Sequence, residues 1–573
     1  MHPCSRQSTW RIIAVLALSL LPIWQSLGDH PLRSQTEARY AIVSNNMAHG
    51  SSGWLIPQYR DQAHLTKPPL TYWAQAACLK TLGHSELAVR LPGALVSSIT
   101  LLGVFALGRR LGGTRHGLIA AGLLGVQPLF VVISRMPATD PWLALAWLGV
   151  SACACALWAR WDHPGRWVVG FWASVALGLM AKGHLIFLPV GIVALWFCLS
   201  GRAKLLAKLR PWYGLPLAAV PLAVWVALVL KQYPEAIDLW RHETLDRAAG
   251  SGDHTEAWWY FLPVFLVGLF PANTMLAPWQ AGQTIQSTWT DARDRAHPIR
   301  QSIQALHNSP NALWGLMIGV SLLVFSLNAG KRINYLLPLA PIVALLGANT
   351  ISLWLDKHHN ASETTMSWRR WLLYSPAAWV ALACLGIAVA GPVVFADKLS
   401  DPFLIWLVPL VPIGLALLWA CGLWRSPKTR QRALIVGLLA LCAGWMWGGQ
   451  LENKIATPRS GRQLFAAVRE LTGNRAPVIQ TVGFSDYSIA FYTGQSTDYI
   501  DPCLPGSQWS QISDADKRQL VYVVEPKAWE KLTAKAPWGQ ILEQRFERVA
   551  VWPDPAEEPD NPSSAWWFFI VRR

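Results

Sequence analysis

Long apolar runs separated by short charged segments constrain this chain more than any other feature of its sequence. The runs recur at lengths near 20 residues, which is the length that an α-helix needs to cross the hydrocarbon core of a bilayer. Only 14% of the residues are charged and 53% are hydrophobic, whereas ordinary globular domains carry about 25% charged residues. We therefore expect an α-helical polytopic membrane protein with about thirteen spans. The expected spans are 10–28, 88–108, 116–134, 140–159, 166–182, 184–200, 212–230, 258–279, 312–330, 333–355, 371–395, 402–424 and 432–449.

The charges of the connecting segments predict the orientation of these spans. Alternate short segments are rich in Arg and Lys, and such segments remain in the cytoplasm. The remaining loops, 29–87 and 231–257, and the C-terminal region then lie outside, which in a bacterium is the periplasm. We expect a multi-pass protein of the bacterial inner membrane with a cytoplasmic N-terminus. These basic loops also account for the formal net charge of +16, so we expect no nucleic-acid partner.

The pattern of apolar residues changes after residue 449. Apolar runs give way to a helical pattern at 464–471 and to strand-like segments at 478–484, 519–524 and 566–571. We therefore expect a transmembrane catalytic domain over 1–449 and a small soluble periplasmic α/β domain over 450–573. Within the first domain, the 29–87 loop shows helical spacing of apolar residues and is expected to form amphipathic helices on the membrane face.

Charged residues at the ends of apolar runs are the informative ones in a membrane protein. On the expected outer face they come from separate loops, yet the topology places all of them at one depth, while the spans themselves are almost free of charge. This pattern favours catalysis or anion handling over a conduction pathway. The residues are Glu37, Arg39, Lys67, Arg135, Asp140, Lys182, His254, Lys331 and Arg332.

Each of these residues also has a structural explanation. Asp140 lies between Thr139 and Pro141 and fits a helix N-terminus. Lys67 and Lys182 fit lysines that extend their side chains to the interface. The pair Lys331-Arg332 lies on the wrong side for the positive-inside rule, which favours a functional role.

Several short motifs occur in a fixed order and spacing across about residues 10–350 of this chain. They resemble the bacterial GT-C glycosyltransferases, in particular the aminoarabinose transferases of lipid A and the protein-mannosyltransferase-like enzymes. The motifs are Glu37-Ala38-Arg39-Tyr40-Ala41, Lys67-Pro68-Pro69-Leu70-Thr71-Tyr72-Trp73, Ala138-Thr139-Asp140-Pro141, Met180-Ala181-Lys182-Gly183, Trp258-Trp259-Tyr260 and Gly330-Lys331-Arg332 with Tyr335.

The resemblance implies transfer of a sugar from a polyprenyl-phosphate-linked donor to a cell-envelope acceptor at the periplasmic face. The acceptor is lipid A, another glycan or a protein. Because the donor is an anionic lipid, its site needs cations at headgroup depth. The residues expected to bind the donor phosphate are Lys67, Lys182, Lys331 and Arg135, and those expected elsewhere in the cavity are Arg39, Tyr40, Tyr72, His254 and Tyr335.

The chain departs from the family at the acids of the first loop. Related enzymes carry adjacent acids where this chain has Thr36-Glu37, and an acid where it has Thr66. Either Glu37 or Asp140 takes the catalytic role, both share it, or activity is altered. The resemblance leaves open a divalent metal at His254 and does not identify a cofactor. The alternatives to an enzyme are an accessory membrane protein and a transporter of a lipid-linked precursor on the same scaffold.

Overall fold

The computed structural model describes part of the chain, in two compact units. One, the membrane unit, comprises Met1–Leu27, Leu65–Thr71 and Arg90–Leu451, and the other, the second unit, comprises Gly28–His64, Tyr72–Val89 and Glu452–Arg573. The predicted division into domains at residue 449 stays a prediction. The described residues are 3–32, 35–50, 53–59, 62–241, 256–276, 309–328, 330–357, 462, 478–482, 487–493, 498–500, 520–524, 546–552 and 566–571.

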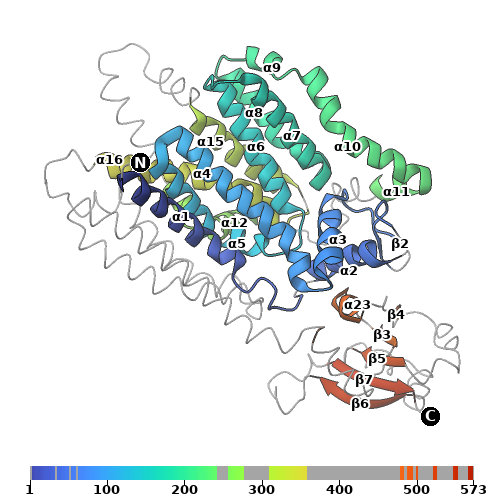
Figure 1. The fold of residues 1–573 in the computed structure, drawn as a ribbon. Helices are drawn as coiled ribbons and strands as arrows, with labels where there is room; N and C mark the ends of the chain where they lie inside the picture. The colour runs from blue at the N-terminus through green and yellow to red at the C-terminus, as the bar shows by residue number, and fades with distance from the viewer. Residues whose placement is uncertain are drawn as a thin grey trace, which may run out of the picture. The chain divides into compact units, whose positions relative to one another are not determined.

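The described part of the membrane unit is built from helices (Figure 1). Within it, 6 helical stretches are long and apolar enough to cross a membrane. The predicted spans 371–395, 402–424 and 432–449 lie outside the described residues, so the expected total of about thirteen spans is not tested. The helices are α1 (Pro3–Trp24), α4 (Glu86–Gly125), α5 (Pro128–Ser134), α6 (Asp140–Trp158), α7 (Pro164–Lys182), α8 (Phe187–Leu199), α9 (Lys204–Lys208), α10 (Pro211–Gln232), α11 (Ala236–Arg241), α12 (Phe261–Gly268), α15 (Pro310–Leu327) and α16 (Ala340–Lys357).

Helix α4 contains a reversal rather than one continuous rod. Its 40 residues would extend about 60 Å as a straight helix, twice the hydrocarbon thickness of a bilayer, but Gly112 and Gly113 leave helical geometry and Gly113 has φ 83°. A Cβ atom at Gly117 would lie 2.5 Å from the carbonyl oxygen of Phe105. The glycines therefore let the chain fold back on itself between the predicted spans 88–108 and 116–134.

Proline explains where the predicted spans and the helices differ. The predicted span 116–134 is interrupted because Gln127, which precedes Pro128, is extended with ψ 125°. The predicted span 258–279 is wrong as one continuous helix, since α12 ends at Gly268 and only a 3-10 helix, Ala272–Leu276, follows Pro271. The span predicted at 333–355 begins with a 3-10 helix, Ile333–Leu339, and continues as α16.

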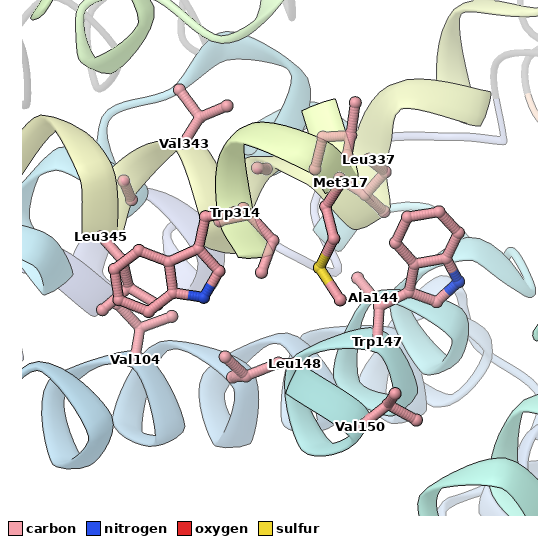
Figure 2. Close-up of a cluster of buried hydrophobic side chains, with 14 of the residues drawn as sticks. Val104, Ala144, Trp147, Leu148, Val150, Trp314, Met317, Leu337, Val343 and Leu345 are labelled. Atoms are coloured by element: carbon pink, nitrogen blue, oxygen red, sulfur yellow. The ribbon is translucent and has the colours of Figure 1, made fainter. Parts of the chain in front are cut away.

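Large apolar side chains fill the interior of the membrane unit. Trp147 of α6 and Trp314 of α15 are fully enclosed, and Met317 and Leu337 lie between them in the same cluster, as Figure 2 shows. Apolar burial between helices drives association only weakly in lipid, so close packing of such side chains stabilises the bundle. This packing holds the ends of α6, α15 and the 3-10 helix Ile333–Leu339 in fixed positions.

The second unit combines helices with a mixed sheet. In the 29–87 region it contains α2 (Gln35–His49) and α3 (Leu70–Leu82), where amphipathic helices are predicted, and a short ladder of β1 (Gln58–Tyr59) and β2 (Gln62–Ala63). After residue 477 it contains α23 (Tyr487–Thr493) and five strands in the order β4-β3-β5-β7-β6. The strands are β3 (Val478–Val482), β4 (Asp498–Ile500), β5 (Leu520–Val524), β6 (Phe546–Trp552) and β7 (Trp566–Val571).

The pairing of these strands is mixed. β3 pairs in parallel with β4 and β5, whereas β7 pairs antiparallel with β5 and β6. The strands predicted near 478–484, 519–524 and 566–571 coincide with β3, β5 and β7. The helix predicted at 464–471 lies outside the described residues.

Candidate active site

A buried carboxylate and a buried ammonium group form the centre of the candidate site in the membrane unit. Lys182 Nζ donates a hydrogen bond to Asp140 Oδ1 at 2.5 Å, and Asn334 Nδ2 donates to Asp140 Oδ2 at 2.7 Å. The side chains of Lys182 and Asp140 are only 8% and 4% exposed. Both carboxylate oxygens thus bind side chains from other elements, so Asp140 does more than begin a helix.

The ends of α6 and α7 place this ion pair. The two helices lie side by side as an antiparallel hairpin (Figure 1), with Asp140 as the first residue of α6 and Lys182 as the last residue of α7. An acid at a helix N-terminus and a base at a helix C-terminus are both favoured by the helix dipole. Gly183 has φ 69° and ends α7 in a conformation that suits glycine.

The predicted cavity residue Tyr335 contacts the same lysine. Lys182 Nζ lies 5.0 Å from the centre of the Tyr335 ring, within the range of a cation–π interaction. Tyr335 belongs to an aromatic cluster. The centre of its ring lies 6.3 Å from that of Phe261 and 5.9 Å from that of Phe325. The structure therefore brings together three of the predicted site residues, Asp140, Lys182 and Tyr335.

Lys331 is also buried, with 5% of its surface exposed. Its Nζ donates to the backbone carbonyl oxygen of Glu256 at 2.8 Å. A carbonyl oxygen satisfies one donor of an ammonium group but does not neutralise its charge. Lys331 thus lies buried three residues before Asn334 in the chain.

The two remaining predicted donor-binding residues differ in their surroundings. Lys67 is half-buried. It interacts electrostatically with the imidazole of His184, which follows Lys182 by two residues. Arg135 ends α5, and its Nη1 donates to the carbonyl oxygen of Pro22 at 2.8 Å. Lys67 therefore lies by the turn that follows Lys182, whereas Arg135 ties α5 to α1.

The first-loop candidates lie in the second unit. Glu37 is buried in the first turn of α2, and Arg39 is half-buried with no hydrogen-bond partner for Nε among the described residues. The rings of Tyr40 and Tyr72 stack at 5.1 Å with an interplanar angle of 24°, and His64 meets Tyr72 edge-on at 6.1 Å. Tyr40 of α2 and Tyr72 of α3 thus pack together inside the second unit, and Glu37 is buried on the same helix as Tyr40.

No metal site is evident in the described part of the chain. It contains no group of three or more His, Cys, Asp or Glu side chains that could hold a metal ion. His254, for which a metal role was left open, lies outside the described residues.

Asn334 and Glu256 were not among the predicted site residues. Asn334 is a neutral amide and carries no signal in a search for charges, although it lies within the Lys331–Tyr335 motif. Glu256 contributes a backbone carbonyl rather than its carboxylate, so its residue type gave no indication of its role.

Comparison with known proteins finds relatives of this chain. Residues 66–227 match the family model for dolichyl-phosphate-mannose-protein mannosyltransferases. The undecaprenyl phosphate-alpha-4-amino-4-deoxy-L-arabinose arabinosyl transferase of Pseudomonas paraeruginosa is 27% identical over 491 residues, which cover 82% of this chain and 81% of that protein. The corresponding enzyme of Pseudomonas aeruginosa strain UCBPP-PA14 has the same identity and coverage.

Solved structures agree on the fold. The crystal structure of ArnT from Cupriavidus metallidurans bound to undecaprenyl phosphate matches with a TM-score of 0.69 and 19% identity, over 98% of each chain. Its apo structure matches with a TM-score of 0.68 and 18% identity, over 99% of this chain and 98% of that one. The chain therefore has the fold of this membrane glycosyltransferase and is similar in sequence to the aminoarabinose transferases.

Proposed function

We propose that the protein transfers a sugar from undecaprenyl phosphate to lipid A or another cell-envelope acceptor. The proposed sugar is the 4-amino-4-deoxy-L-arabinose named for its relatives. The observation that carries the proposal is the buried group of Asp140, Lys182 and Asn334 at the start of a spanning helix. Burial of charges at this depth is costly and is retained where it serves function.

Lysines are suited to the donor in this proposal. Transfer breaks the bond between the sugar and the phosphate, and the leaving group is a lipid phosphate that retains negative charge. Lys331, Lys182 and Lys67 supply positive charge, which stabilises the charge that develops on the leaving oxygen. Arg135 is proposed to join them, with its Nη1 bound to the backbone carbonyl oxygen of Pro22.

Two carboxylates are proposed for the acceptor. The acceptor hydroxyl forms the new bond to the anomeric carbon, and its proton passes to a carboxylate that acts as general base. We assign this step to Asp140 together with Glu37, one taking the proton and the other orienting the acceptor or a cation. Arg39, Tyr40, Tyr72, Tyr335 and His254 are proposed to line the cavity around the sugar.

The orientation and the remaining architecture belong to the same proposal. We assign the Asp140 end of α6 to the periplasmic face, the N-terminus to the cytoplasm, and residues 450–573 to a soluble periplasmic α/β domain. About thirteen spans are proposed in all, from the lengths of the apolar runs. A reporter that is active only outside the cytoplasm should work after residue 573 and fail within 201–210. Activity within 201–210 would contradict the orientation.

Sugar transfer itself is tested with purified protein. The protein is incubated with undecaprenyl phosphate carrying 4-amino-4-deoxy-L-arabinose and with lipid A, and the lipid A product is identified by its mass increase. Mass spectrometry of lipid A and envelope glycans from a deletion strain identifies the acceptor independently. Unchanged envelope glycans in that strain, combined with no transfer in vitro, would favour the accessory-protein alternative.

A further inference from the structure

Two arginines from different elements surround a pair of indole rings at the other end of the α6–α7 hairpin. The guanidinium carbon of Arg110, on α4, lies 5.1 Å from the ring centre of Trp161 and 5.8 Å from that of Trp167. The guanidinium carbon of Arg166, on α7, lies 5.1 Å from the Trp167 ring. The positively charged Arg110 and Arg166 thus both contact the same pair of indole rings.

The loop that carries these indoles is held in one conformation. The backbone N–H of Trp161 donates to the carbonyl oxygen of Ala156 at 2.9 Å, which closes the end of α6. The Trp167 indole N–H donates to the carbonyl oxygen of Asp162 at 3.0 Å, and the two indoles meet at 65° with centres 5.5 Å apart. The aromatic platform is therefore fixed before any ligand binds.

The charges of Arg110 and Arg166 are available to a ligand. Both residues are exposed, and in the part of the chain that the structure describes no ion pair joins either of them to a carboxylate. Arg202 provides the contrast, because it lies 4.3 Å from the Trp158 ring and also donates to the Trp158 carbonyl oxygen at 2.5 Å. Arg202 completes the end of α6, whereas no hydrogen bond of the Arg110 or Arg166 guanidinium is found within the described residues.

The cluster lies at a defined depth. Helix α6 has 19 residues and so extends about 28 Å between Asp140 and Trp158, close to the thickness of the hydrocarbon core. The cluster of Arg110, Trp161, Arg166 and Trp167 is therefore at the membrane interface opposite the Asp140–Lys182 pair. Indole rings favour this headgroup depth.

We propose that this cluster is a binding site for the phosphate of an anionic phospholipid headgroup in the leaflet opposite the candidate active site. Guanidinium groups bind phosphate oxygens through paired hydrogen bonds, and basic pockets between spanning helices on the cytoplasmic side bind anionic headgroups. The indoles hold the guanidiniums in position and contact the glycerol and upper acyl region of the same lipid. The partner is the bilayer itself, and the site does not depend on the proposed sugar transfer.

The test titrates the detergent-solubilised full-length protein with phosphatidylglycerol, while tryptophan fluorescence and the melting temperature are recorded. We expect a saturable change with phosphatidylglycerol that weakens as ionic strength rises. Arg110→Gln combined with Arg166→Gln should weaken binding about tenfold or more, since each removes a hydrogen bond to a charged group. Arg109→Gln is the matched control, because it removes the same charge from the adjacent exposed position, and it should bind like the wild type.

Other probes separate this site from general charge attraction. Phosphatidylcholine and inorganic phosphate should produce no comparable change. Equal binding by either of them, or wild-type binding of phosphatidylglycerol by the double variant, would overturn the proposal. If the double variant shows no cooperative melting, Arg110→Lys and Arg166→Lys replace it. They keep the charge but lose the paired hydrogen bonds, so wild-type affinity in both would equally overturn it.

Discussion

The two ends of the α6–α7 hairpin use charge in opposite ways. At one end, Asp140 and Lys182 are buried and neutralise one another. At the other end, Arg110 and Arg166 are exposed, gather around indole rings, and have no carboxylate partner among the described residues. The hairpin therefore has a buried ion pair at one end and an excess of exposed positive charge, shared with Arg110 of α4, at the other.

Buried and interfacial charges have different requirements in such a chain. A buried charge needs a partner, because an unpaired ion in a low-dielectric environment is costly. An interfacial cation needs none, because water and lipid headgroups solvate it. Buried pairs therefore indicate where chemistry is expected, and unpaired interfacial cations indicate where the protein contacts its bilayer.

The largest expected effect comes from removing the acid at the closed end. Asp140→Asn keeps the shape of the side chain but cannot take a proton, so sugar transfer should fall by about 10²-fold to 10⁴-fold. Transfer is measured with purified protein at saturating donor. Asp162→Asn, an exposed acid in the loop at the opposite end of the hairpin, is the control and should keep full activity. Wild-type turnover in Asp140→Asn would restrict Asp140 to a structural role.

Replacing Lys182, the base of the ion pair, should reduce stability in addition to weakening the donor use proposed for it. Lys182→Met leaves the Asp140 carboxylate buried without its cation, which typically costs about 3–5 kcal/mol. The double variant Asp140→Asn with Lys182→Met removes both charges and should recover much of that loss. Thermal melting in detergent measures both. Equal losses of melting temperature in Lys182→Met and in the double variant would mean that the ion pair does not stabilise this end of the α6–α7 hairpin.

Lys331→Met sharpens the assignment of donor binding. The side chain is buried, and no ion pair joins it to a carboxylate within the described residues. Its loss should weaken use of the phosphate-linked donor about tenfold or more, as expected for a hydrogen bond to a charged group. Donor dependence of the transfer rate is the measurement. Lys231→Met, an exposed lysine in the last turn of α10, should behave like the wild type, and a similar loss there would point to a general charge effect.

The smallest expected effect is at Arg202, which completes the end of α6. Arg202→Met removes one hydrogen bond and one cation–π contact, each worth about 1 kcal/mol. A modest fall in melting temperature with unchanged sugar transfer is expected. A large loss of transfer would show that the two ends of the hairpin are coupled.

Hydropathy and charge alone predicted the elements that carry the site. The predicted span 140–159 and α6 share their first residue, and Asp140 and Lys182 were both expected at one face of the membrane. Their direct pairing was not predicted, because topology fixes the depth of a residue but not its position within the plane of the membrane.

Other features lacked a sequence signal. The sequence did not indicate the break inside the span predicted over 258–279, because mean hydropathy does not register that Pro271 interrupts a helix. Asn334 was missed because a neutral amide near the end of a span resembles any other polar residue. The contacts that orient a catalytic group come from tertiary packing, and their residue types are often unremarkable.

The glycine reversal in α4 has a consequence for how the protein is made. Because backbone meets backbone near Gly117 and Phe105, the segments on either side of Gly112 and Gly113 form a helical hairpin that can assemble before later spans emerge from the ribosome. The basic residues Arg109, Arg110 and Arg115 lie at its tip. Retention of these cations on one side would anchor the hairpin during insertion, so the small-residue turn also gathers the charges that orient this hairpin.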